Sequence, residues 1–138
     1  MITEDYCSFE VAKLLKEKGF NGQCRAAYTN YGKLFTIQIQ QYVTNVLCSK
    51  GKLWDCAAPT FQMAMKWLRE VHYLHITVHP GISEYGFVWT YAIVLVKEVG
   101  KGETHFYKIS QITTPIVKSK SYEQACETAI KYCLENLI

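Results

Sequence analysis

The sequence predicts an α+β fold of two layers, in which helices pack on one face of a mainly antiparallel sheet. Three segments carry apolar residues at helical spacing, and five further segments combine strand-forming residues with flanking turn residues. The expected order is α-β-β-α-β-β-β-α, and strands grouped between helices are typical of α+β proteins. The 138 residues contain no linker and no low-complexity stretch, so we expect a single domain over residues 1–138.

Each predicted helix begins after a hydroxyl residue that can serve as its N-cap. Ser8 precedes a helix that Gly19 ends, Thr60 precedes the second helix, and Ser121 precedes the third. All three starts share one pattern: a hydroxyl residue, an aromatic residue, Glu or Gln, any residue, and Ala. An acid or amide in the first turn suits the helix dipole, and the aromatic and Ala lie on one inward stripe. We interpret the pattern as helix-start chemistry and not as a repeat.

The predicted strands form a pair before the second helix and a group of three after it. Their expected ranges are 24–29, 33–43, 74–79, 85–99 and 104–112. Pro80-Gly81 is expected to end the third of them in a turn. Residues 48–58 are expected to form a loop.

The strand expected at 85–99 sorts large and small side chains onto opposite faces. One face carries Tyr85, Phe87, Trp89, Tyr91, Ile93 and Leu95, and the other carries Val88, Thr90, Ala92, Val94 and Val96. Because small side chains permit close packing, we expect the helices on the second face and the aromatic row on the face toward water. Such exposed apolar area marks a partner surface. Cover by a loop at 44–58 containing Trp54, self-association, and contact with another ligand all stay open.

The candidate binding residues are therefore the aromatic row with two histidines of the preceding strand: Tyr85, Phe87, Trp89, Tyr91, His75 and His79. The two histidines share one strand face, but four strand residues span about 13 Å, too far for one metal ion. Cys48 and Cys56 are separated by seven residues, a spacing unlike that of zinc fingers. We expect no metal and no cofactor.

Motifs for catalysis are missing from the sequence. It contains no serine elbow, phosphate loop or dinucleotide turn, and no local motif singles out a nucleophilic cysteine. Cys126 and Cys133 lie seven apart on one predicted helix, about 10 Å, which is too far for a disulfide. The six cysteines are expected to be buried free thiols. We expect no catalytic residues and a protein that is not an enzyme.

Charge and hydropathy limit the partners. The net charge is +3, but the lysines are scattered along the chain, which disfavours nucleic acid as a partner. No stretch reaches the roughly 18 apolar residues of a membrane span. The acidic N-terminal segment lacks the form of a signal peptide, so we expect a cytoplasmic protein without a membrane partner.

Three functions from different classes fit these observations. The first is a non-enzymatic protein that binds another macromolecule, with a second copy of itself, as a homodimer, among the candidates. The second is a small-molecule binder that holds a nucleotide-like ligand between Trp89, Tyr91 and nearby histidines. The third is an RNA-binding module, because the order α-β-β-β-α over residues 60–138 resembles a double-stranded-RNA-binding domain. Glu123 and Gln124 stand where such domains carry lysines.

The helical segments also resemble a group of small proteins of gut Bacteroides genomes, prophages and phages. The resemblance covers MITEDYCSFEVAKLLKEKGF, APTFQMAMKWLREVH and SYEQACETAIKYCLENLI. It implies a context, namely a phage or mobile-element accessory protein of a gut anaerobe. It carries over no activity and no site residue.

Overall fold

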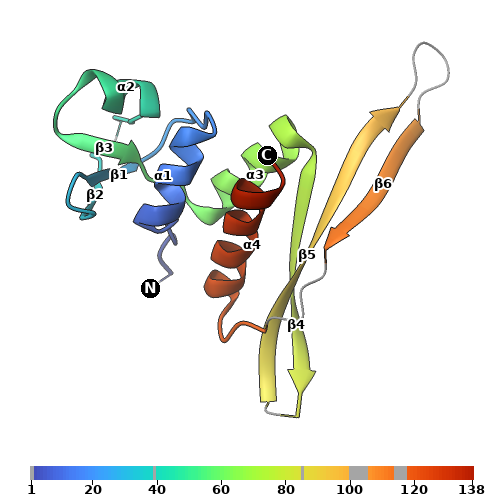
Figure 1. Ribbon diagram of the computed structural model, residues 1–138. Helices are drawn as coiled ribbons and strands as arrows, with labels where there is room; N and C mark the ends of the chain where they lie inside the picture. The colour runs from blue at the N-terminus through green and yellow to red at the C-terminus, as the bar shows by residue number, and fades with distance from the viewer. Residues whose placement is uncertain (1, 39, 85, 100–105, 114–117) are drawn as a thin grey trace.

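The computed structural model describes residues 2–38, 40–84, 86–99, 106–113 and 118–138 (Figure 1). Its elements are, in chain order, α1 (Phe9–Glu17), β1 (Ala26–Thr29), β2 (Leu34–Thr36), α2 (Asn45–Lys50), β3 (Trp54–Ala57), α3 (Phe61–His72), β4 (Leu74–Ser83), β5 (Gly86–Val99), β6 (Phe106–Thr113) and α4 (Tyr122–Asn136). All described strand pairs within these elements are antiparallel. The chain therefore has the predicted α+β fold.

The three predicted helix caps are confirmed. The side-chain oxygens of Ser8, Thr60 and Ser121 accept hydrogen bonds from backbone N–H groups three residues later, at 3.3, 3.2 and 3.1 Å. Gly19 terminates α1. Its φ is +93°, which lies in the left-handed region that glycine adopts without strain. Sequence and local structure therefore agree at the helix starts.

The larger sheet has the strand order β4-β5-β6, and here the predicted turn at Pro80-Gly81 is wrong. β4 continues to Ser83, and Pro80 pairs in register with Trp89. The carbonyl of Tyr73 accepts from the N–H of Val96 at 3.0 Å, which sets the alternation of backbone groups along β4. Pro80 then stands at a position whose backbone points to the outer edge, where a missing N–H breaks no ladder bond.

The smaller sheet has the order β2-β1-β3, and it corrects two further expectations. The expected loop at 48–58 instead contains the end of α2 and all of β3, which pairs with β1. The strand expected at 33–43 is confined to Leu34–Thr36. After it, Gln41 donates a backbone hydrogen bond to Gln38 at 3.1 Å, and Gln40 has a φ of 75°, so the chain turns away from the sheet.

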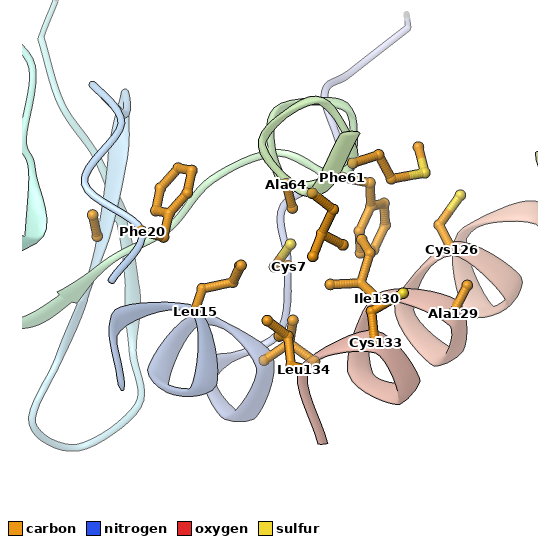
Figure 2. Packing of buried hydrophobic residues seen from close by; sticks show 14 of the residues in the cluster. Cys7, Leu15, Phe20, Phe61, Ala64, Cys126, Ala129, Ile130, Cys133 and Leu134 are labelled. Atoms are coloured by element: carbon orange, nitrogen blue, oxygen red, sulfur yellow. The ribbon is translucent and has the colours of Figure 1, made fainter. Parts of the chain in front are cut away.

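Two helices, α3 and α4, pack together against one face of the larger sheet. α4 contacts both β4 and β5, α3 contacts β4, and α1 packs on α4. Figure 2 shows Leu15 of α1, Ala64 of α3 and Leu134 of α4 gathered in one apolar cluster. The inward stripe of α4 consists largely of small side chains, namely Ala125, Cys126, Ala129 and Cys133. A stripe of this kind leaves depth for bulky side chains from the sheet.

Side-chain contacts tie the first helix to the last. The Glu127 carboxylate of α4 accepts hydrogen bonds from the Ser8 hydroxyl and from the Ser8 N–H, the latter at 3.2 and 3.3 Å. Lys131 forms an ion pair with Glu10 at 2.8 Å. The Glu127 carboxylate lies at the N-terminus of α1, where it interacts favourably with the positive end of the helix dipole. The smaller sheet is thus held to the larger one through α1 and α4.

Candidate functional site

The aromatic row of β5 faces the helices, so the expectation that it faces water is wrong. Tyr91 is 3% exposed and Ile93 is fully buried, both in the cluster that contains the inner residues of α4. The ring of Trp89 meets the ring of Tyr122 edge to face at 5.4 Å. The physical reason is the small stripe of α4: the space between helix and sheet is filled by large side chains from β5.

The predicted site residues therefore do not share one surface. His75 and His79 lie on the opposite face of the sheet, where they pair in register with Val94 and Thr90. Phe87 lies beyond the helices and is 62% exposed. Tyr85 lies outside the described residues. The helices, and not a loop at 44–58, cover the inner part of the aromatic row.

The face of the larger sheet opposite the helices is the candidate site. It is built from β4 and β5, and its described side chains are His75, Thr77, His79, Ser83, Val88, Thr90, Ala92, Val94, Val96 and Glu98. Among the described elements, no helix or strand lies on this face (Figure 1). The side chains are mostly small, β-branched and uncharged, so they form a flat surface that is accessible to water. We call it the open sheet face.

Sequence reasoning assigned the β5 residues of this face to the buried side, and it placed His75 and His79 with the aromatic row. The signal that identifies them lies on the last helix, where Ala125, Ala129 and Cys133 recur on the inward stripe. Two small-residue surfaces packed together would leave the bulky row of β5 without cover. Size complementarity between elements therefore predicts the open sheet face better than the size of β5 side chains alone.

The described histidines lie on both sides of the larger sheet. His72 closes α3, and its ring meets Trp67 edge to face at 4.7 Å. Burial lowers the pKa of His72, and its Nε2 atom is buried with no hydrogen-bond partner within the described part of the chain. Within that part, no group of three or more His, Cys, Asp or Glu side chains is arranged to hold a metal ion.

All six cysteines are free and buried, as predicted. Burial raises the pKa of Cys24, Cys56 and Cys133 to about 12. At neutral pH these thiols are therefore protonated, and a protonated thiol is a poor nucleophile. Their surroundings are those of small apolar core residues.

The site proposed for a nucleotide-like ligand does not form around Trp89 and Tyr91. The Tyr91 ring is enclosed between β5 and the helices, and its burial raises the pKa of its hydroxyl. His75 and His79 are on the far side of the sheet from that ring. A ligand could not touch all of these residues at once.

Comparison with models of known protein families, with curated proteins and with solved structures gave no match for this chain. Within the described residues, every helix is too short or too polar to span a lipid bilayer.

Proposed function

We propose that the chain is a non-enzymatic binding protein whose contact surface is the open sheet face, and that its first partner is a second copy of itself. One observation supports this proposal above the others: all described helices that touch the larger sheet pack on the same face of it. The phage or mobile-element context implied by the helical resemblance is part of the proposal. A protein of this kind acts by occupying a partner, not by transforming a substrate.

The chemistry of the open sheet face suits self-association. Where β4 and β5 pair, its described side chains are serine, threonine, valine, alanine and the two histidines. A surface with few charges can meet its own copy without like-charge repulsion, which is the constraint that a two-fold interface imposes. The β-branched side chains also lose little conformational freedom on contact.

The size of this face indicates a weak complex. Ten residues of β4 at about 3.3 Å each, and two paired strands about 4.8 Å wide each, give a face of roughly 33 by 10 Å, on the order of 300 Å². Stable interfaces bury about 800 Å² on each partner. We therefore expect a dimer with a dissociation constant in the micromolar range or above, which changes with protein concentration.

Sedimentation velocity over a wide range of protein concentration tests the proposal. The wild-type protein should shift toward a dimer as its concentration rises. Thr77→Glu places a charge in the centre of the face at an exposed position and should keep the protein monomeric. Gln62→Glu on the exposed side of α3 is the matched control and should leave the dimer intact. A wild-type protein that stays monomeric at the highest concentration would remove self-association from the proposal.

A second candidate function has one observation in its favour. The unit α3-β4-β5-β6-α4 places both helices on one face of a three-stranded antiparallel sheet, the order of a double-stranded-RNA-binding domain. Lys118 and Lys120 are exposed just before α4, but its first turn carries Glu123. A gel-shift titration with duplex RNA at low salt tests this candidate, and the absence of a shift would exclude it.

A further inference from the structure

Formal charge is distributed unevenly between the two sheets. Residues 18–59, which contain the smaller sheet, hold five basic residues and one acidic residue, a formal charge of +4. The rest of the chain holds ten basic and eleven acidic residues, a formal charge of −1. In sequence the lysines look scattered, but residues 18–59, which carry the excess positive charge, lie together at one end of the molecule, away from β5 and β6 (Figure 1).

The one acidic residue of this region faces the first helix. Asp55 lines a shallow depression with Lys13 and Lys16 of α1, and its carbonyl accepts a hydrogen bond from Lys16 at 2.5 Å. Trp54 pairs in register with Thr29 and Cys56 pairs with Tyr28, so Trp54 lies on the side of the sheet opposite to Cys56, which packs with Ala12 of α1. The side of the smaller sheet that carries Trp54 has no carboxylate from residues 18–59.

That side displays aromatic rings next to lysines. The rings of Phe35 in β2 and Trp54 in β3 are 5.8 Å apart, and Phe35 is 41% exposed. The Lys33 ammonium lies 5.0 Å from the centre of the Phe35 ring. Tyr31 at the tip of the β1-β2 hairpin is 98% exposed, and Lys52 is exposed two residues before Trp54. We call this group the aromatic-basic end.

We propose that the aromatic-basic end binds single-stranded nucleic acid, with nucleobases stacked on Phe35 and Trp54 and phosphates contacted by Lys33 and Lys52. The proposal concerns the smaller sheet and does not depend on the function proposed for the larger one. Phe35 is exposed and Trp54 is half-buried beside it, and aromatic rings next to lysines fit the alternation of base and phosphate along a strand.

The magnitudes favour nucleic acid over an acidic protein. Stacking of a base on an aromatic side chain contributes about 1–3 kcal/mol. An acidic peptide would bind mainly through exposed lysine–carboxylate pairs, which contribute about 0–1 kcal/mol each. Its carboxylates would not stack on the two rings, so this contribution to binding would be lost. With about two or three phosphates contacted, we expect a dissociation constant of roughly 10⁻⁴ to 10⁻⁶ M and a log–log salt slope of about −1.4 to −2.

The experiment is a fluorescence anisotropy titration of a labelled short oligo(dT) with the whole protein, repeated over a range of salt concentrations. Phe35→Ala should weaken binding about tenfold, the loss of one stacked base. Lys33→Gln and Lys52→Gln should each reduce the salt slope by about 0.7. Phe87→Ala and Lys118→Gln alter an exposed ring and an exposed lysine elsewhere, and they should leave binding unchanged.

Three results would overturn the proposal. The first is no binding at low salt. The second is equal affinity for an abasic oligonucleotide, which would show that the rings do not stack on bases, or equal affinity for polyglutamate of the same charge, which would mark the surface as one for acidic proteins. The third is equal loss in Phe35→Ala and Phe87→Ala. Thermal unfolding of each variant checks its fold, and if Phe35→Ala does not fold, the two exposed lysine variants decide the outcome alone.

Discussion

The middle strands of the two sheets differ in the size of their buried side chains, which are small around β1 and large on β5. Around β1, both faces are covered, and the buried residues include Ala26, Ala27 and Ala57, each fully buried. Around β5, the helix-facing side is filled by Tyr91 and Ile93, while the other side has no cover among the described elements. Small side chains let helix and strand backbones approach closely from both directions, whereas bulky ones fill the space from a single direction.

This difference separates structural from functional surface. A strand covered on both faces uses all its side chains for packing, and only the rim of the smaller sheet can meet a partner. A strand covered on one face has a whole row of side chains left over. The four predictions below test this division, beginning with the largest expected effect.

Alkaline pH should abolish the packing of small side chains. Burial raises the pKa of Cys24, Cys56 and Cys133 to about 12, whereas thiols of the unfolded chain ionise near 9. The unfolded state therefore holds fewer protons between about pH 9 and 12, and stability falls as pH rises through that window. Each thiol contributes a slope on the order of 1 kcal/mol per pH unit within that window, and several thiols together approach the whole stability of a small domain.

Urea unfolding at a series of pH values, followed together with thiolate ultraviolet absorbance, measures this effect. Thiolate absorbance should rise only as the protein unfolds. A folded protein that gains thiolate absorbance near pH 10 would contradict the burial of these side chains. Cys56→Ala serves as the internal control, since it should reduce the slope without removing it, because burial raises the pKa of the other thiols as well.

Ile93→Ala should destabilise the protein by about 2–5 kcal/mol, because it removes a fully buried side chain and leaves a cavity between β5 and α4. Val94→Ala, the adjacent residue on the open sheet face, should cost less than half as much because Val94 is only half-buried. Urea denaturation of both variants gives the comparison. Equal losses would mean that the two faces of β5 are buried alike.

Ala27→Leu should destabilise the protein by about 1–3 kcal/mol, because the middle strand of the smaller sheet has no room on either face. Ala92→Leu makes the same change on the open sheet face and should change stability by less than about 0.5 kcal/mol. Thermal unfolding of the pair measures the difference. If Ala92→Leu is the more damaging of the two, the open face is not open.

Glu127→Gln should cost about 1 kcal/mol, since the carboxylate that accepts from Ser8 loses its charge at the N-terminus of α1. This is the smallest of the four effects, and it tests the link between the two sheets. Glu70→Gln, which alters an exposed pair with Lys66, should cost less than about 0.5 kcal/mol. A Glu127 variant as stable as the Glu70 variant would show that α1 is held by packing alone.

The sequence predicts the elements better than their arrangement. Caps at Ser8, Thr60 and Ser121 are local chemistry, and they were recognisable from four or five residues each. The division into two sheets was missed because α2 and β3 are short and are held by distant contacts. The side-chain amide of Asn45 makes two of these distant contacts: it donates to the Phe20 carbonyl at 2.7 Å and accepts from the Ala57 N–H at 2.9 Å.

The candidate surface was harder to predict, for a physical reason. Alternation along β5 separates two faces correctly, but it does not say which face the helices take. That choice depends on the side chains of α4, more than twenty residues later. His75 and His79 share one face of β4, as predicted, but it is the open face and not the face of the aromatic row to which they were assigned.

The contact between Ser8 and Glu127 also bears on how the protein is made. The two residues are 119 positions apart, so the first helix leaves the ribosome long before Glu127 has been synthesised. At about 5–20 residues per second, the delay is roughly 6–24 s. Throughout that time the inner residues of α1 lack the last helix against which they pack. The early half of the chain is therefore exposed to chaperones and proteases for a time that lengthens as translation slows.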